Sequence, residues 1–307
     1  MLRFALKRGL YALVTLWLLV SLVFVLVRLT GDPTTMLEGG DPQFAQTLRE
    51  RWGLDHSYPV QYGLFLANLM QGDFGLSYQR GTSVTHLYFE RLPYSLKLAF
   101  AAFVLSIAIG LPLGIWSAMK VNTVWDRLAS ICAISGLSIP NFVVGLVLIV
   151  IFGVHLDLLP VMGAGSGTFD LVHLIMPATA LGWYFSGSMI RITRSSMLEV
   201  LRSDYIKLVR YKGMPETNVI LKHALSNAFI PILTLAGINL VVMVNVAVPI
   251  EVVFSWPGVG RLLFDAMINR DFPLVQGIVL MAGIMVLLLN FIIDLLYAYL
   301  DPRIRLA

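Results

Sequence analysis

Residues 98–119 read LAFAAFVLSIAIGLPLGIWSAM, a run of 22 residues without Asp, Glu, Lys or Arg. An α-helix rises about 1.5 Å per residue, so a run of this length can cross a hydrocarbon core roughly 30 Å thick. Five further runs of at least 19 residues without these charges occur, at residues 9–27, 128–154, 171–190, 224–250 and 272–293. The sequence therefore predicts six membrane-spanning helices.

The composition of the whole chain agrees with a membrane protein. Of its 307 residues, 58% are hydrophobic and 13% are charged, whereas ordinary soluble domains carry about 25% charged residues. A chain this apolar is neither a typical soluble enzyme nor a disordered protein. The only cysteine, Cys132, lies inside one of the apolar runs, which excludes an intrachain disulfide and a thiolate metal site. The net charge of +4 is too small to indicate a nucleic-acid partner.

The start of the chain allows two interpretations. Three basic residues precede the first apolar run, as in a cleaved signal peptide, but the run is 19 residues long and no small-x-small cleavage site follows it. An uncleaved first span is therefore expected. Placing the N-terminus in the cytoplasm puts fourteen basic residues on that side and seven on the other, with Lys97 at the border. The positive-inside bias then predicts that both termini are cytoplasmic.

This topology predicts one membrane domain with loops. Residues 1–30 form the cytoplasmic N-terminus and first span, and residues 31–93 form an outer segment with short helices near 43–52 and 60–70. Residues 94–297 form the membrane domain, with spans at about 96–118, 131–154, 172–190, 229–250 and 274–296, a cytoplasmic loop at 191–228 and a tail at 298–307.

Several predicted spans contain prolines or asparagines that interrupt their apolar character. A proline removes a backbone hydrogen bond and bends a helix, which a membrane protein tolerates where protein or a water-filled cavity satisfies the freed carbonyl. One interpretation is a translocation path with bending helices; the alternative is ordinary bundle packing. The candidate path or kink residues are Pro112, Pro140, Asn141, Asn239 and Asn245.

The cytoplasmic loop 191–228 carries seven of the fourteen inner basic residues. Near its start, apolar residues recur at helical spacing, which predicts a short amphipathic helix with an apolar face made of Leu201, Tyr205, Leu208 and Val209. Gly213 can end this helix, and Pro215 with Glu216 can begin another. A helix, glycine turn and helix in this position could dock to a soluble partner or lie on anionic lipid.

The residues of this loop favour docking. Residues 203–213, SDYIKLVRYKG, followed by LKHALSNA at 221–228 and Pro231, resemble the EAA loop of binding-protein-dependent ABC importer permeases, and more narrowly the dipeptide, oligopeptide and nickel branch. Other segments look like landmarks of the same family, namely GDP at 31–33, GDFG at 72–75, RITRSSM at 191–197, WPGVG at 256–260 and DPRIR at 301–305. The chain departs from the family pattern at Lys207, Leu208 and Val209, where the motif takes its name, and at the bulky Tyr211.

The resemblance implies a subunit of a type I importer in a bacterial inner membrane. Such an importer combines two six-helix permeases, two cytoplasmic ATPases and an external solute-binding protein, and ATP and Mg²⁺ bind to the ATPases rather than to this chain. The implied cargo is a di- or oligopeptide, with nickel, glutathione or another small solute as alternatives. The residues implied in coupling to the ATPase are Asp204, Tyr205, Lys207, Arg210, Lys212, Gly213 and Glu216.

Other functions find little support in the sequence. The chain has no Gly-Lys pair and hence no P-loop, its five histidines lack metal-site spacing, and the serine-containing stretch at 163–167 has no base fixed nearby. We therefore expect no catalytic and no metal-binding residues. An ion-coupled secondary transporter is the alternative outside the family, but it needs charges near the membrane midplane, whereas Lys97 and Asp294 lie near the ends of their spans.

Overall fold

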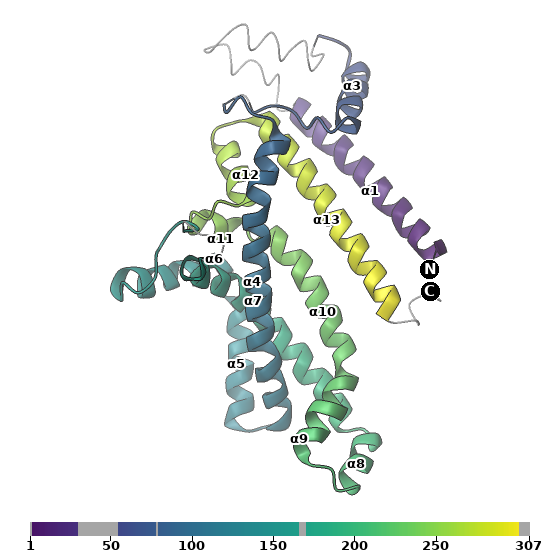
Figure 1. The fold of residues 1–307 in the computed structure, drawn as a ribbon, viewed down its shortest axis with the longest axis vertical. Helices are drawn as coiled ribbons and strands as arrows, with labels where there is room; N and C mark the ends of the chain where they lie inside the picture. The colour runs from purple at the N-terminus through teal and green to yellow at the C-terminus, as the bar shows by residue number, and fades with distance from the viewer. Residues whose placement is uncertain (1, 30–54, 78, 166–169, 301–307) are drawn as a thin grey trace. The chain divides into compact units, whose positions relative to one another are not determined.

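A computed structural model describes residues 2–29, 55–77, 79–165 and 170–300, with side chains between residues 8 and 293 of these ranges (Figure 1). In these ranges the regular structure is helical, and one isolated antiparallel bridge joins Leu76 to Ser83. The predicted all-α fold is thus confirmed. The predicted helix near 43–52, the family-like segments at 31–33 and 301–305, and the side chain of Asp294 lie outside what the structure describes.

The chain divides into two compact units, and one of them is built from two stretches that are far apart in the sequence. Residues 1–92 group with residues 262–307, and residues 93–261 form the second unit. The last helix of the chain therefore belongs with the first one, although the sequence places it at the end of the continuous membrane domain 94–297.

The first unit is built on two long helices, α1 (Leu2–Leu29) and α13 (Phe272–Leu300). They pack against each other in opposite directions, so that α1 begins at the end where α13 finishes (Figure 1). A shorter helix, α3 (Tyr58–Met70), is held to α1 by a hydrogen bond of 2.7 Å between the hydroxyls of Tyr62 and Ser21. This unit also contains the start of α4 (Val84–Met119) and most of α12 (Val259–Ile268).

The second unit is arranged around α7 (Leu171–Leu201). Besides the rest of α4, its elements in chain order are α5 (Val124–Ser138), α6 (Asn141–Leu148), the π-helix η2 (Ile149–His155), α8 (Asp204–Tyr211), α9 (Glu216–Asn218), the π-helix η3 (Val219–Ala224), α10 (Leu225–Val246) and α11 (Val248–Val253). Among the elements that pack on α7 are α5, α6, α10 and α11. Small residues allow the close approach, since a Cβ added to Gly187 of α7 would lie 2.5 Å from the carbonyl oxygen of Ala133 in α5.

The predicted third span, 131–154, is not one helix. Between the helical stretches Val124–Ser138 and Asn141–His155 the chain turns by 104°. Ile139 has extended backbone angles (φ −93°, ψ 123°), because the ring of Pro140 disfavours a helical conformation in the residue before it. The composition of the run indicates apolar surroundings but does not reveal this break.

In the part of the chain that the structure describes, four helical stretches are long and apolar enough to cross a membrane, and the bent pair makes five if it counts as one span. The four stretches are Arg8–Leu29, Val84–Met119, Glu216–Val246 and Phe272–Ile293. The helix α7, which contains the predicted fourth span 172–190, is long enough but is not among them. Fifteen of its residues are buried, and a helix covered by other helices can carry the small and hydroxylated residues that a lipid-facing helix avoids.

Candidate functional site

A hairpin of short helices joins α7 to α10 over residues 202–224 (Figure 1). The carboxylate of Asp204 lies in the first turn of α8, where its negative charge interacts favourably with the positive end of the helix dipole. After α8 the chain turns at Gly213, which has a left-handed φ of 75° and donates its N–H to the carbonyl of Arg210 at 3.0 Å. Pro215 then precedes α9. The structure thus has a helix, a glycine turn and a second helical arm.

The apolar face of α8 differs from the predicted one. Ile206 is fully buried and Val209 is 8% exposed, in a cluster with apolar residues of α7, η3 and α10. Tyr205 and Leu208, which were expected on the buried face with Leu201 and Val209, are 49% and 55% exposed. Because η3 covers the side of α8 that carries Ile206, the neighbouring residues Tyr205 and Leu208 are left on the outer surface.

Two polar contacts tie the arms of the hairpin together. The guanidinium of Arg210 in α8 binds the carboxylate of Glu216 in α9 through two hydrogen bonds, of 2.5 and 3.1 Å. The Glu216 carboxylate raises the pKa of Arg210. The Tyr205 hydroxyl lies 2.7 Å from Nδ1 of His223 in η3. Both contacts join residues on opposite sides of the glycine turn, so they stabilise the angle between the arms.

The outer surface of the hairpin combines large exposed side chains with positive charge. Tyr211 is 88% exposed, next to Lys212, and Leu221 in the second arm is 59% exposed, next to Lys222. Among the residues that the structure describes, Lys212 and Lys222 form no ion pair, whereas Lys207 lies 2.8 Å from Asp204 and lowers the pKa of that carboxyl. Relative to the rest of a protein surface, tyrosine is enriched in protein interfaces and lysine is depleted, so the exposed Tyr211 is the part of this surface that most resembles an interface.

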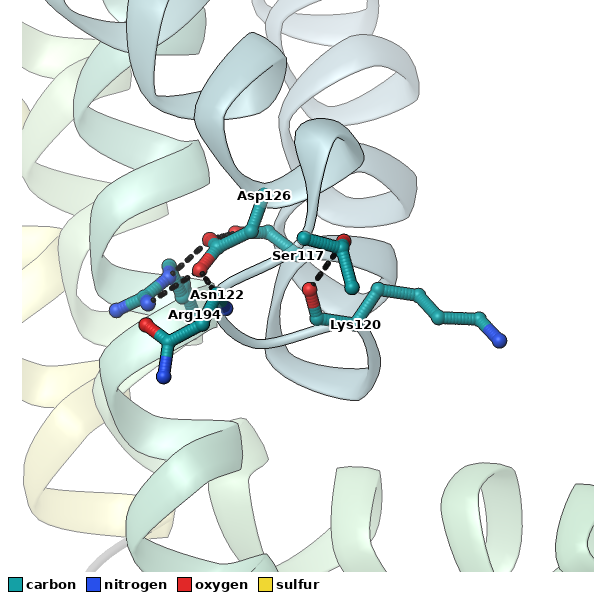
Figure 2. A network of polar contacts seen from close by, with 6 residues as sticks. Ser117, Lys120, Asn122, Asp126 and Arg194 are labelled. Carbon is teal, nitrogen blue, oxygen red and sulfur yellow. Dashed lines mark hydrogen bonds and ion pairs between the residues drawn. The ribbon is translucent and has the colours of Figure 1, made fainter.

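A buried ion pair lies at the same end of the second unit as the hairpin. Both carboxylate oxygens of Asp126 in α5 accept hydrogen bonds from Arg194 in α7, at 2.8 and 2.9 Å (Figure 2). The Ser117 hydroxyl donates to the same carboxylate at 2.5 Å, and the backbone N–H of Asn122 donates at 2.9 Å. Asp126 is only 5% exposed. The network therefore joins the α4–α5 turn to α7 shortly before α7 leads into the hairpin.

The sequence-based prediction did not include this pair. Arg194 lies in one of the family-like segments, but no partner was assigned to it. A signal was present, because Asp126 is the only acidic residue between Glu90 and Asp157 and it opens a long apolar run. An acid in such a place needs a cationic or hydrogen-bonding partner.

Comparison with known families decides what kind of protein carries this hairpin. The family model of the binding-protein-dependent transport system inner membrane component matches residues 110–306, and the model of the N-terminal part of the same membrane component matches residues 1–99. The chain belongs to this family. It is the permease component of an ABC importer, and the predicted membership of that family is confirmed.

Relatives of this permease match along its whole length. The glutathione transport system permease proteins GsiC of Escherichia coli K12 and of Salmonella typhimurium LT2 are each 38% identical to it over 308 residues, covering 99% of both chains. A structure of the MetNI methionine ABC transporter in an inward-facing conformation matches 71% of the permease with a TM-score of 0.59, and an amino acid ABC transporter matches 70% with 0.54. These structures are 18% identical to the permease and cover 97% and 94% of their own chains. They support the fold.

The predicted path and kink residues occupy separate places in the permease. The Asn239 amide in α10 is 6% exposed and donates to the Ser188 hydroxyl of α7 at 3.2 Å. Asn141, at the start of α6, donates to a backbone carbonyl near the end of α10 at 3.4 Å, and Asn245 donates to a carbonyl within α10. The amides of Asn239 and Asn141 thus join α10 to α7 and α6, whereas the amide of Asn245 bonds within its own helix. Pro140 lies at the break between α5 and α6, while Pro112 lies inside the continuous helix α4.

A groove of about 1100 Å³ lies in the second unit of the permease between α4 and α7. Its lining is mostly apolar and includes Phe100 and Val104 of α4 and Leu174 of α7. Lys97 also lines it, with its ammonium 5.7 Å from the centre of the Trp256 ring.

The segment after α10 is fixed to α4 by a buried carboxylate. Glu251 in α11 is 1% exposed. One of its oxygens accepts the Ser95 hydroxyl of α4 at 2.6 Å, and the other accepts the backbone N–H of Arg261 at 3.1 Å. The indole of Trp256 donates to the carbonyl of Tyr94 at 2.9 Å. The family-like segment WPGVG at 256–260 therefore folds around Glu251 and rests on α4.

Proposed function

We propose that this permease couples solute transport to ATP hydrolysis through the hairpin at 202–224, within the predicted loop 191–228. The observation that carries the proposal is the construction of the hairpin. Its inner face is anchored by Ile206 and Val209, its arms are joined by Arg210 and Glu216, and its outer face exposes Tyr211 beside basic residues. A rigid body with an exposed aromatic and basic surface can transmit force from a soluble partner to α7 and α10.

The proposed partners are two ATPase subunits, a second permease and an external solute-binding protein, with ATP and Mg²⁺ on the ATPases. Membership of a binding-protein-dependent importer family implies the ATPase and the binding protein; the stoichiometry is part of the proposal. We further propose that the hairpin and both termini face the cytoplasm of a bacterial cell. In this orientation the cytoplasmic side carries fourteen basic residues and the opposite side carries seven, as the positive-inside bias requires.

The proposed roles of the hairpin residues fall into two groups. Gly213, Arg210 and Glu216 set the angle between the arms, because they form the turn and the clamp across it. Tyr205, Lys207 and Lys212 lie on the exposed surface and contact the ATPase directly, and Asp204 holds Lys207 in place.

The proposed cargo is a short peptide. Glutathione is a tripeptide, and the permeases GsiC, 38% identical over the whole length, are named for its transport. This favours glutathione or a peptide of similar size over nickel. In an importer that depends on a binding protein, the separate binding protein selects much of the cargo.

Replacement of Gly213 tests the coupling. A Cβ at this position would meet no heavy atom within 4 Å, so a substitution acts through the backbone, whose φ of 75° is unfavourable for a β-branched residue. Asparagine tolerates this conformation. The whole importer, reconstituted in liposomes, should lose most substrate-stimulated ATP hydrolysis and uptake in Gly213→Val and keep most of both in Gly213→Asn.

A control separates coupling from general strain. Gly163 has a φ of 85°, and a Cβ there would also meet no atom within 4 Å, but it lies in the loop after η2. Gly163→Val should leave the ratio of uptake to hydrolysis unchanged. Equal loss in both valine variants, or normal coupled uptake in Gly213→Val, would contradict the hairpin role.

The same liposomes test the cargo. Glutathione and dipeptides should stimulate ATP hydrolysis by the importer, and stimulation by nickel complexes alone would overturn the proposal of a peptide cargo.

A further inference from the structure

A small apolar cavity lies beside the α4–α5 turn. It has a volume of about 190 Å³ and lies in the second unit, where its walls are Leu113, Trp116, Ser117, Trp125, Leu128, Ala129 and Cys132. Apolar cavities of about 150 Å³ stay dry and take up molecules of the size of benzene. This cavity is therefore large enough for a segment of hydrocarbon chain.

Two neighbouring tryptophans line the cavity. Trp116 at the end of α4 is 54% exposed and Trp125 at the start of α5 is 59% exposed, and their ring centres lie 5.9 Å apart. The apolar surface continues along α5, where Ile131 and Ile134 are 61% and 60% exposed. Tryptophans gather at the level of the lipid headgroups, so this turn lies at a membrane surface with the cavity on its hydrocarbon side.

The charge of the turn points to an anionic headgroup. Asp126 is the acid of the turn, and Arg194 occupies both of its carboxylate oxygens. Lys120 and Arg127 flank the turn with exposed side chains, and among the described residues neither has an ion-pair partner. Lys120 extends away from the Asp126 network (Figure 2). Two cations without ion-pair partners in the described residues therefore flank the turn whose residues line the cavity.

We propose that the α4–α5 turn binds one anionic phospholipid, with part of an acyl chain in the cavity and the phosphate at Lys120 and Arg127. Basic pockets beside membrane helices are suited to such headgroups. The site is separate from the hairpin and does not depend on the proposed cargo. It adjoins the buried ion pair, because Ser117 both lines the cavity and donates a hydrogen bond to Asp126.

The single cysteine of the permease provides a local test. Cys132 lines the cavity and is the only thiol in the chain. The rate of its alkylation by N-ethylmaleimide can be measured on the purified full chain in mixed micelles of detergent with phosphatidylglycerol or, at equal mole fraction, phosphatidylcholine of the same acyl chains. Phosphatidylglycerol should slow alkylation several-fold relative to phosphatidylcholine, and inorganic phosphate should have no effect.

Matched variants identify the headgroup contact. Lys120→Gln with Arg127→Gln should abolish the difference between the two lipids. Arg191→Gln with Arg202→Gln removes the same charge from exposed positions of α7 and its C-cap and should keep the difference. Equal rates in both lipids, a difference that survives Lys120→Gln with Arg127→Gln, or protection that appears only after a second permease or an ATPase is added would overturn the proposal.

Discussion

Glu251 holds the segment after α10 in place through hydrogen bonds to its side chain. Its carboxylate is 1% exposed and accepts hydrogen bonds from the Ser95 hydroxyl and from the backbone N–H of Arg261, directly after the WPGVG segment. Burial raises the pKa of this carboxyl above its ordinary value of 4.5, although the hydrogen-bond donors lower it. The desolvation of an almost inaccessible charge outweighs the contribution of these donors.

The raised pKa of Glu251 predicts a pH-dependent stability. The native state keeps the proton to a higher pH than the unfolded chain, so this group's contribution to the free energy of unfolding is fully present below its ordinary pKa of 4.5 and falls as pH rises through the folded pKa. Glu251→Gln removes this fall and adds only a constant loss of hydrogen bonding. The Tm of the variant minus that of the wild type should increase between about pH 5 and about pH 8. A difference in Tm that stays constant over this range would mean that the donors keep the carboxylate ionised and its pKa at or below the ordinary value.

At the scale of elements, two ion pairs of different kinds hold the helices around the hairpin. The Arg210–Glu216 pair lies on the surface, with side chains 43% and 55% exposed, and it joins only α8 to α9. The Asp126 side chain is 8% exposed and also accepts hydrogen bonds from Ser117 and from the backbone of Asn122. The buried pair therefore joins α5, α7 and the α4–α5 turn.

Exchange of the charges should distinguish these pairs. Arg210→Glu with Glu216→Arg restores an ion pair worth about 0.2–1 kcal/mol and should leave Tm near the wild-type value. Asp126→Arg with Arg194→Asp leaves the donors on Ser117 and Asn122 without an acceptor. It should destabilise the chain by roughly 2 kcal/mol, less than the roughly 3–5 kcal/mol lost when one partner of a fully buried pair is removed, because Arg194 keeps 31% exposure. Thermal unfolding in detergent measures both, and full recovery in the second exchange would contradict the network role.

At the scale of the whole molecule, the first and last helices belong to the same unit. The helices α1 and α13 run in opposite directions, and α1 begins at the end where α13 finishes (Figure 1). This arrangement, together with the distribution of basic residues, predicts that both ends of the chain face the cytoplasm. A green fluorescent protein fused to either end should fluoresce, and alkaline phosphatase fused to either end should be inactive. Opposite results at the two ends would require an odd number of crossings.

The sequence by itself determined the class of the protein and the place of the glycine turn in the hairpin at 202–224. Apolar runs of 19 or more residues report directly on the medium around a helix, because no water is present in the hydrocarbon core to solvate charges. The turn at Gly213 could also be predicted from the sequence, because glycine at a helix end and proline shortly after it act through their own backbone angles. These are local properties, because the residues that cause them are neighbours in the sequence.

Only the tertiary structure decided which faces and charges meet. It paired Asp126 with Arg194, 68 positions apart in the chain, and it turned Ile206 rather than Tyr205 toward the core, because η3 covers that side of α8. It placed Glu251 against Ser95, and it grouped the last helix with the first. Contacts between distant residues depend on how helices pack, and periodicity within one helix contains no information about the partner that will cover it.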